Sequence, residues 1–387
     1  MTIAERYLEL GLRLGRHEPE LVDSYYGPAE LRQRIDDEPL REPASLAADA
    51  AELLAEVDDR WLASQVRALE TTARTLAGEE LPYAEEVELT YGIRPRWIDE
   101  REFERAQAEL DEALAGPGDL AARYARWFEE AAVPPTAVEG AVDAAMALVR
   151  ERTREAIGLP EGEEIELEIV TGERWFGYAH YLGDFRTRIS VNTDLSFPAG
   201  DLLRFAAHEG YPGHHTHRAW QEADLVRGDG RIDATLDLLW SPDAVISEGL
   251  AETGPDFVVD GDAHGELAER LRTLGFEYDA EVGARVAEAR RTLYYVPSNV
   301  TILLHERGAS RQEAWDYAAH WTLQPADRVD KILENAEERR SRGYVHSYSE
   351  GRRLCSAFVD GDPARLRRLM TARLLPAEQD AATAPER

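Results

Sequence analysis

Four of the ten histidines in this 387-residue chain fall within ten residues of each other: His208, His214, His215 and His217. An acidic residue, Glu209, directly follows the first of them. Neutral imidazole nitrogens and carboxylate oxygens are the ligands that catalytic Zn²⁺ takes in proteins. A carboxylate beside such ligands can also act as the general base that activates a water molecule. The stretch therefore indicates a catalytic metal centre.

The pair His208-Glu209 begins the pattern His-Glu-x-x-His, in which two histidines four residues apart share one helix face. Here Pro212 occupies the position of the second histidine. On a regular helix His214 would lie about 600° around the axis from His208, on a different face. His215 would share the face but would lie about 10.5 Å along the axis. Because zinc bonds are about 2.1 Å long, neither could join His208 on a straight helix.

Pro212 and Gly213 are expected to interrupt that helix. Proline lacks the backbone N–H that a helix needs and disfavours helical geometry in the residue before it, whereas glycine accepts unusual dihedral angles. A break between Gly210 and His214 could absorb two residues and bring a later histidine to the metal. We predict this break, with the histidine at 214 or 215 as the second ligand.

A third ligand is expected from another helix, because catalytic zinc takes three protein ligands and keeps one position open. Glu248 stands out in the apolar stretch Val-Ile-Ser-Glu-Gly-Leu-Ala. Ser241 and Pro242 precede it as a helix N-cap and first turn. Glu252 lies one turn further on the same face, where it could accept a hydrogen bond from the far nitrogen of a histidine ligand.

The elements that must position these residues are mostly helical. Residues 1–157 have apolar side chains at helical spacing, and a further helix is expected over 202–210. Near Gly158 the pattern changes to alternation, which is typical of strands. It predicts a small antiparallel sheet of three strands: 165–171, 175–182 and 185–192. We expect a mainly α fold, with a helical amino-terminal region, 1–157, packed closely against a catalytic region, 158–387.

The composition excludes several classes of protein. With 43% hydrophobic residues the chain is globular, and its net charge of −32 argues against binding to nucleic acid or anionic membranes. The single cysteine, Cys355, permits no internal disulfide and no multi-cysteine zinc site. The amino-terminus is charged and lacks the apolar core of a secretory signal, and no apolar run of about 18 residues occurs. We therefore expect an acidic, cytoplasmic protein with no membrane or nucleic-acid partner.

These motifs resemble the domain of unknown function 885 (DUF885) family. The resemblance rests on His-Glu-Gly-Tyr-Pro-Gly-His-His at 208–215 and Ser-Glu-Gly-Leu-Ala-Glu at 247–252. That family is similar to the gluzincins, which are zinc peptidases with a glutamate as third ligand. The gluzincins include the mostly helical carboxypeptidase Taq and oligopeptidase types. The resemblance thus implies a gluzincin-like architecture and one Zn²⁺ ion.

The resemblance also assigns residues. It implies His208, His214 and Glu248 as metal ligands and Glu209 as the base. It favours His214 over His215 because the family's second histidine directly follows Pro-Gly. His215 is then expected to support the ligands from beside them.

Three further stretches fit the resemblance. Residues 23–28, which contain a Gly-Pro turn signal, resemble an amino-terminal segment of small members. Residues 189–194 resemble an edge strand that pairs with substrate backbone in related peptidases, which places Asn192 at the substrate. Residues 344–352 resemble a carboxyl-terminal segment. Its polar side chains could stabilise an oxyanion or hold a substrate carboxylate, or only cap and pack a helix: Tyr344, His346, Tyr348 and Arg352. Leu250 stands where many members have tryptophan, which affects the expected substrate pocket.

The sequence leads to one main hypothesis and two alternatives. The main hypothesis is a zinc-dependent hydrolase that cleaves short peptides, with Glu209 activating water. The same residues would also permit hydrolysis of a non-peptide amide or ester. A non-catalytic scaffold that binds a metal is the second alternative. The expected partner is a peptide or small-molecule substrate, and the oligomeric state is left open.

Overall fold

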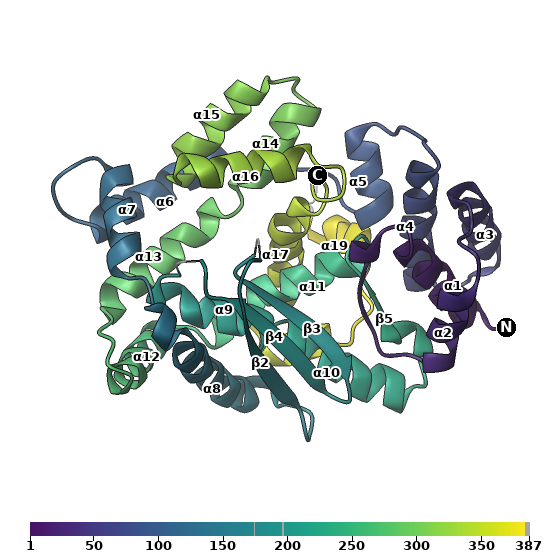
Figure 1. The fold of residues 1–387 in the computed structure, drawn as a ribbon, viewed down its shortest axis with the longest axis horizontal. Helices are drawn as coiled ribbons and strands as arrows, with labels where there is room; N and C mark the ends of the chain where they lie inside the picture. Colours follow the sequence, from purple (N-terminus) through teal and green to yellow (C-terminus); the bar gives the residue numbers. More distant parts are fainter. Residues whose placement is uncertain (174, 196, 384–387) are drawn as a thin grey trace.

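The computed structural model of the protein describes residues 1–173, 175–195 and 197–383. Most of this chain is helical, and two small β-sheets complete the fold (Figure 1). The prediction of a mainly α protein with a small sheet is therefore confirmed.

The amino-terminal helices pack around a core of their own, at the right of Figure 1. The first helix begins with a capping box, in which the side chains of Thr2 and Glu5 each accept a hydrogen bond from the other's backbone N–H. Its apolar face, which includes Tyr7 and Leu8, is buried. The helices around this core are α1 (Ile3–Gly15), α2 (Ala29–Asp37), α3 (Pro43–Glu56) and α4 (Arg60–Leu76). The next helix, α5 (Tyr83–Tyr91), packs in a smaller cluster with Val245 and Leu354.

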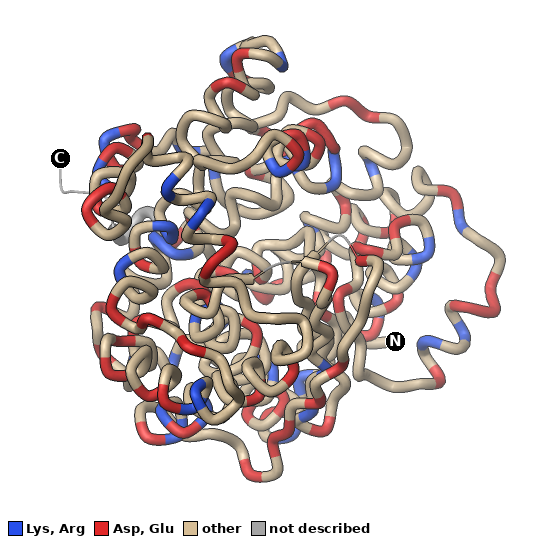
Figure 2. The backbone as a smooth tube through the Cα atoms, turned by 60° about the vertical axis from the view of Figure 1, so that its left-hand side comes forward, with Lys and Arg blue, Asp and Glu red and all other residues tan. Residues whose placement is uncertain are grey.

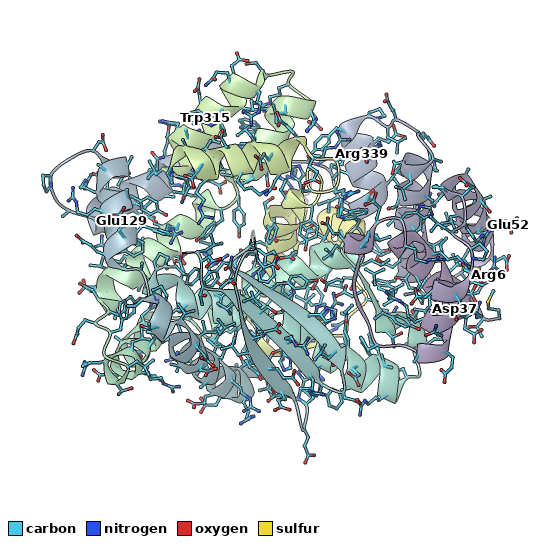
Figure 3. The ribbon with its side chains drawn as sticks, in the orientation of Figure 1. Arg6, Asp37, Glu52, Glu129, Trp315 and Arg339 are labelled. Atoms are coloured by element: carbon cyan, nitrogen blue, oxygen red, sulfur yellow. The ribbon has the colours of Figure 1, made fainter. Side chains whose placement is uncertain are left out.

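A second group of helices occupies the left and upper parts of Figure 1. Their inner faces form a core that includes Phe103 and Leu333. Charged side chains project outward from both groups, as Figure 3 shows for Glu52 and Glu129. The helices of the second group are α6 (Glu100–Ala113), α7 (Leu120–Glu130), α13 (Ala280–Leu293), α14 (Val296–His305), α15 (Arg311–Thr322) and α16 (Ala326–Glu337).

A three-stranded sheet lies in the lower centre of Figure 1 and contains β2 (Glu164–Val170), β3 (Gly177–Gly183) and β4 (Arg186–Asn192). Asp184 and Phe185 connect β3 to β4 with φ angles of 54° and 60°, as a two-residue hairpin of type I′ requires. This hairpin places β4 between β3 and β2, and β2 runs parallel to β4. The sheet is therefore mixed. The expectation that the strand at 189–194 forms a sheet edge is wrong, because β4 is central and β3 is an edge strand.

The helices that carry the histidines pack behind this sheet. Ile189 and Val191 of β4 share a core with Leu203 and Ala207, which lie on the helix that ends at Glu209. The helices of this layer are α8 (Val138–Ile157), α9 (Leu202–Glu209), α10 (His214–Trp220) and α12 (Gly261–Thr273).

Two helices cross at the centre of the molecule, α11 (Pro242–Thr253) and α17 (Val345–Val359). The side chain of Ser241 caps α11 by accepting a hydrogen bond from Ala244, and Pro242 follows it, as predicted. A Cβ at Gly249 would overlap the carbonyl group of Gly351, so glycine is what allows the two backbones to meet. Two shorter helices close the chain, α18 (Pro363–Leu369) and α19 (Pro376–Thr383).

A second sheet joins the amino-terminal helices to the rest of the fold. β1 (Val22–Tyr25) pairs antiparallel with β5 (Leu236–Leu238). The segment 23–28 thus begins as a strand before it turns at Gly27. The local sequence does not predict this strand, because its pairing partner lies more than 200 residues later in the chain.

Acidic residues occur along the whole backbone trace in Figure 2, so the net charge of −32 marks no single face. None of the helices among the described residues is both long enough and apolar enough to cross a membrane.

Candidate metal centre

The helix that carries the first histidine is interrupted where the sequence predicts it. α9 ends at Glu209 and α10 begins at His214. The peptide bond before Pro212 is cis. A Cβ at Gly213 would overlap the carbonyl group of His208, so only glycine fits this close approach of the chain to itself.

The break brings His214 next to His208. One ligand atom from each of His208, His214 and Glu248 lies within 4.8 Å of the other two. The Nε2 atoms of His208 and His214 lie 3.4 and 3.6 Å from the two carboxylate oxygens of Glu248. Ligand atoms around a tetrahedral ion with bonds of about 2.1 Å are roughly 3.4 Å apart. The three residues could therefore hold a metal ion.

Neighbouring side chains orient both rings with Nε2 toward Glu248. The Nδ1 of His208 lies 3.3 Å from an oxygen of Glu252, and the Nδ1 of His214 lies 3.2 Å from the hydroxyl of Ser247. Partners of this kind fix the tautomer and the orientation of a histidine ligand. Glu252 lies one helical turn after Glu248, beside the far nitrogen of His208, where its spacing predicts it.

Glu252 is itself held as a carboxylate. Arg204 forms an ion pair with it, and Tyr295 donates a 2.8 Å hydrogen bond to it. Burial would raise the pKa of Glu252, but the charge of Arg204 and the hydrogen bonds from His208 and Tyr295 hold this pKa well below its usual range. The negative charge beside Nδ1 of His208 favours the proton on that nitrogen, which leaves Nε2 free to bind a metal.

The donor atoms fit a divalent metal ion. Oε2 of the buried Glu248 has no hydrogen-bond partner among the described residues, and Oε1 accepts a 2.5 Å hydrogen bond from Tyr344. Burial lowers the pKa of His214 to about 4, so the ring is neutral, as a metal ligand must be. Two imidazoles and one carboxylate are also a donor set found in catalytic zinc sites.

Two cavities meet at this cluster, and both are lined by His208, Glu209 and Tyr348. The first, here called the polar cavity, has a volume of about 290 Å³ and is also lined by Asp23 and Tyr178. The second, called the aromatic cavity, has a volume of about 370 Å³. Its other lining includes the rings Phe176, Phe197, Phe205, Tyr294 and Tyr295.

Glu209 therefore stands at the junction of the cavities without being part of the ligand cluster. Burial raises the pKa of Glu209 to about 7, and the negative charges of Glu248 and Asp23 act in the same direction. A carboxyl group with a pKa near neutrality can both accept a proton and return it.

Two of the tyrosines that the sequence singles out lie at the cluster. Tyr344 donates its hydroxyl to Glu248, and its ring is 5.7 Å from that of Tyr348. The ring of Tyr348 lies 6.3 Å from that of His208. Both tyrosines line the polar cavity.

Two other residues expected near the ligands or the substrate have different partners. His215 lines the polar cavity, but its Nε2 lies 3.2 Å from Glu163 and not at the ligand cluster. Asn192 is fully buried, and its amide nitrogen donates to the carbonyl oxygens of Glu173 and Trp175. It lines neither cavity, because β4 is the central strand of its sheet.

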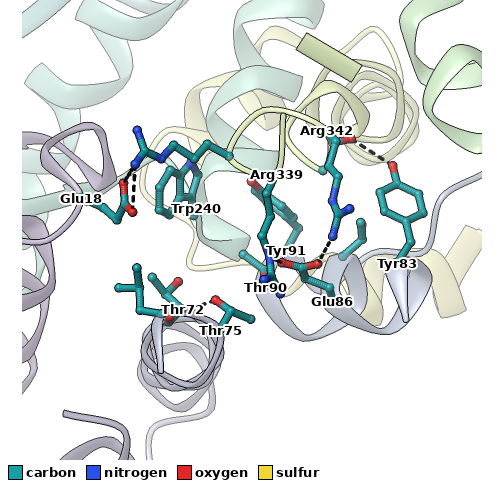
Figure 4. Close-up of a pocket in the computed structure, with 14 residues that line it drawn as sticks. Glu18, Thr72, Thr75, Tyr83, Glu86, Thr90, Tyr91, Trp240, Arg339 and Arg342 are labelled. Atoms are coloured by element: carbon teal, nitrogen blue, oxygen red, sulfur yellow. Dashed lines mark hydrogen bonds and ion pairs between the residues drawn. The ribbon is translucent and has the colours of Figure 1, made fainter. Parts of the chain in front are cut away.

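His346 lies in the first turn of α17 and lines neither cavity at the cluster. It is fully buried, and its Nε2 lies 2.7 Å from the hydroxyl of Tyr83. Tyr83 lines a separate cavity of about 150 Å³, in which Arg342 and Arg339 both pair with Glu86 (Figure 4). None of the candidate metal ligands lines this third cavity.

Arg352 and Leu250 also point elsewhere. Arg352 donates to the carbonyl oxygen of Glu252 and pairs with Asp256, and it lines neither cavity at the cluster. Leu250 is buried in a core that includes Cys355, so the missing tryptophan changes that core and not the lining of the cavities. Burial raises the pKa of the Cys355 thiol to about 12, which fits a packed, unreactive side chain.

Glu163 is a residue that the sequence does not single out, yet it holds the break between α9 and α10. It accepts a 2.5 Å hydrogen bond from Tyr211, pairs with Arg150 at 2.6 Å, and lies 3.2 Å from His215. Glu163 stands in the acid-rich run 161–168, where nothing distinguishes it from its neighbours. Only the folded chain shows which of these glutamates is buried.

The chain was compared with known proteins. No protein-family model matches it, and no curated protein matches it, so the likeness to the DUF885 family stays a resemblance of motifs. A solved structure from Colwellia psychrerythraea, described as a "putative lipoprotein", has a TM-score of 0.58 and 15% identity over 86% of this chain and 65% of its own. A second, from Shewanella oneidensis and described as a "putative lipoprotein of unknown function", has a TM-score of 0.54 and 12% identity over 91% of this chain and 69% of its own.

These matches show a shared fold, and the chain spans about two thirds of the length of each of the two proteins. An M32 carboxypeptidase from Deinococcus radiodurans R1 also matches, with 13% identity over 96% of this chain and 88% of its own. Its TM-score of 0.33 is too low to bear on fold or function.

The expectation of a cytoplasmic protein is contradicted by this comparison. The Colwellia and Shewanella proteins, which share its fold, are both described as putative lipoproteins, a description that does not fit a cytoplasmic location.

Proposed function

We propose that the protein is a metal-dependent hydrolase, and specifically a zinc peptidase that cleaves short peptides. The main support is the convergence of His208, His214 and Glu248 within 4.8 Å beside Glu209, at the junction of two cavities. A lone histidine cluster would be compatible with metal storage or a structural site. Glu209, a partly buried carboxylate that is not a ligand and lines both cavities beside the cluster, favours a catalytic site over these alternatives.

The three ligands would hold the zinc ion, which when bound polarises water and the substrate carbonyl. Glu209 removes a proton from the attacking water and passes it to the leaving nitrogen, a double role that suits its pKa of about 7. The hydroxyl of Tyr348 donates a hydrogen bond to the carbonyl oxygen as negative charge develops there. Tyr344 holds Glu248 in place through its 2.5 Å hydrogen bond.

The two cavities give room for groups on both sides of the bond that is cleaved. Their volumes of about 290 and 370 Å³ suit one or a few residues on each side, which favours short peptides over folded proteins. β3 is an edge strand that lines the polar cavity through Gly177, Tyr178 and Ala179 and the aromatic cavity through Gly177, so an extended peptide could pair with this edge.

The decisive experiment separates chemistry from metal binding. The wild-type protein, Glu209→Gln and the control Glu164→Gln, which neutralises an exposed glutamate of β2, would be loaded with zinc and incubated with a mixture of short peptides. We expect equal zinc content in all three, cleavage by the wild type and the control, and loss of at least about 100-fold in kcat/KM for Glu209→Gln. Zinc binding without any cleavage by the wild type would overturn the peptidase proposal.

A further inference from the structure

The polar cavity contains an acidic side chain, Asp23, that takes no part in the ligand cluster. It comes from β1, where it is the extra residue of a bulge between the pairs Val22–Leu238 and Ser24–Asp237, and Asp237 of β5 lines the same cavity. Tyr178 of β3 donates its hydroxyl to Asp23 from across the cavity. The three strands thus bring together residues that the chain separates by more than 200 positions.

Asp23 has less positive charge beside it than Asp237 has. Arg218 pairs with Asp237 at 2.5 Å and with Asp243 at 3.2 Å, so its guanidinium is shared between those two carboxylates. Within the described part of the chain, Asp23 forms no ion pair of its own. Its side chain shares hydrogen bonds with Tyr178 and Asp237, which supply no positive charge. A carboxylate that is partly removed from water without a cation is costly to the fold.

The charged groups that line the polar cavity give the same result when they are counted together. They comprise four carboxylates and one guanidinium: Asp23, Asp237, Glu209, Glu248 and Arg218. An ammonium group that enters the cavity would therefore meet more acidic than basic side chains.

We propose that Asp23 binds the ammonium group of the substrate, and that this group is the free amino end of a short peptide. The proposal rests on the proposed peptidase function and deepens it, because the protein would then be an exopeptidase that cleaves near the free amino end of its substrate. Asp23 holds the amino group in the polar cavity, and Glu209 stands between that cavity and the aromatic one. The residue after the cleaved bond then enters the aromatic cavity, where Phe176, Phe197 and Phe205 favour a large apolar side chain.

Kinetics on matched peptides test this assignment. A mixture of short peptides and the same mixture with acetylated amino ends would be given to zinc-loaded wild type, Asp23→Asn and the control Asp184→Asn. Asp184 lies in the exposed β3–β4 turn and pairs with Arg227, so its variant makes the same charge change outside the cavity. We expect the wild type and the control to prefer free over acetylated peptides by on the order of 100-fold in kcat/KM, and Asp23→Asn to lose at least tenfold of that preference.

Acetylated peptides that carry a lysine before the cleaved bond identify the source of the ammonium group. Their cleavage at the rate of the free peptides, and its loss in Asp23→Asn, would still support an ammonium site at Asp23 but would assign it to a side chain. Equal cleavage of free and acetylated lysine-free peptides, with lysine making no difference, would overturn the inference and leave the peptidase proposal standing.

A binding measurement keeps the inference testable if no peptide is cleaved. Calorimetric titration of zinc-loaded Glu209→Gln with a free and an acetylated tripeptide would compare affinities without turnover. Binding of the free tripeptide at least tenfold tighter than the acetylated one supports the amine site, even if the peptidase proposal fails, provided that the double variant Glu209→Gln, Asp23→Asn loses this difference. Equal affinity for the two tripeptides overturns the amine site. If Asp23→Asn does not fold, Tyr178→Phe removes the hydrogen bond that orients Asp23, and a preference unchanged in that variant would count against the inference.

Discussion

Gly249 of α11 packs directly against Gly351 of α17, because a Cβ at Gly249 would overlap the Gly351 carbonyl group and come within 2.7 Å of Cys355 Sγ. This crossing sets the distance between Glu248, which precedes the first glycine, and Tyr344, which lies at the start of α17. The glycine in the motif Ser-Glu-Gly is therefore explained by helix packing, while the glutamate beside it belongs to the ligand cluster.

We expect Gly249→Ala to lower the free energy of unfolding by at least about 1–3 kcal/mol, since the added methyl must force the helices apart. Denaturant titration followed by circular dichroism measures this change. Gly265→Ala is the matched control, because it lies in α12 with no atom within 4 Å of its Cβ position. That variant should gain stability by up to about 1 kcal/mol, as alanine favours a helix over glycine. Similar effects of the two substitutions would contradict the packing argument.

Substitution of His208, His214 or Glu248 by alanine is expected to remove bound zinc, which would be one ion per chain in the wild-type protein. Each variant leaves two ligands, too few to hold a catalytic ion tightly. Elemental analysis of the folded, gel-filtered proteins provides the measurement.

His215→Gln provides the contrast, because the ring of His215 lies beside Glu163 and not at the cluster. We expect this variant to keep its zinc while losing some stability. Loss of zinc from His215→Gln together with retention by His214→Ala would reverse the assignment of the second ligand.

Glu252→Gln should weaken zinc binding by about 10- to 100-fold without abolishing it, because an amide can still accept a hydrogen bond but no longer carries the charge that favours the proton on Nδ1 of His208. Competition with a chelator measures the affinity. Glu266→Gln, which neutralises an exposed glutamate paired with Arg152, should leave the affinity unchanged. An unaltered affinity in Glu252→Gln would show that Glu252 does not support the ligand.

Glu163 makes the stability of the fold depend on pH. Burial opposes its charge, but hydrogen bonds from His215, Tyr211 and Arg150 outweigh burial and lower the pKa of Glu163 to about 2. Because the folded-state pKa lies below the unfolded value of 4.5, the stabilisation is fully present above pH 4.5 and is lost as the pH falls toward 2. The contribution is on the order of 2–3 kcal/mol at neutral pH.

Glu163→Gln should therefore destabilise the protein at pH 7 and reduce the difference in unfolding free energy between pH 7 and pH 3. Urea titrations at the two pH values give both quantities. Glu161→Gln, two residues away and exposed, is the control and should behave as the wild type. If the two variants show the same pH dependence, Glu163 is not the group responsible.

The sequence by itself determined the features that depend on near neighbours in the chain. Proline cannot continue a helix and Gly213 tolerates close packing, so the break after Glu209 follows from Pro212-Gly213 alone. Glu248 and Glu252 share a helix face because they are four residues apart. Metal-ligand chemistry and a mainly helical fold follow in the same way from residue type and periodicity.

Tertiary structure decided which polar groups face the cluster and which face each other. Asn192, His346 and Arg352 have the right chemistry for a substrate site, but carbonyl, hydroxyl and carboxylate partners from elsewhere in the fold occupy their side chains. Asp23 reaches the cavity only because β1 pairs with β5. Such contacts join residues far apart in sequence, and their choice depends on the burial and the hydrogen bonds that the whole fold supplies, which local spacing does not encode.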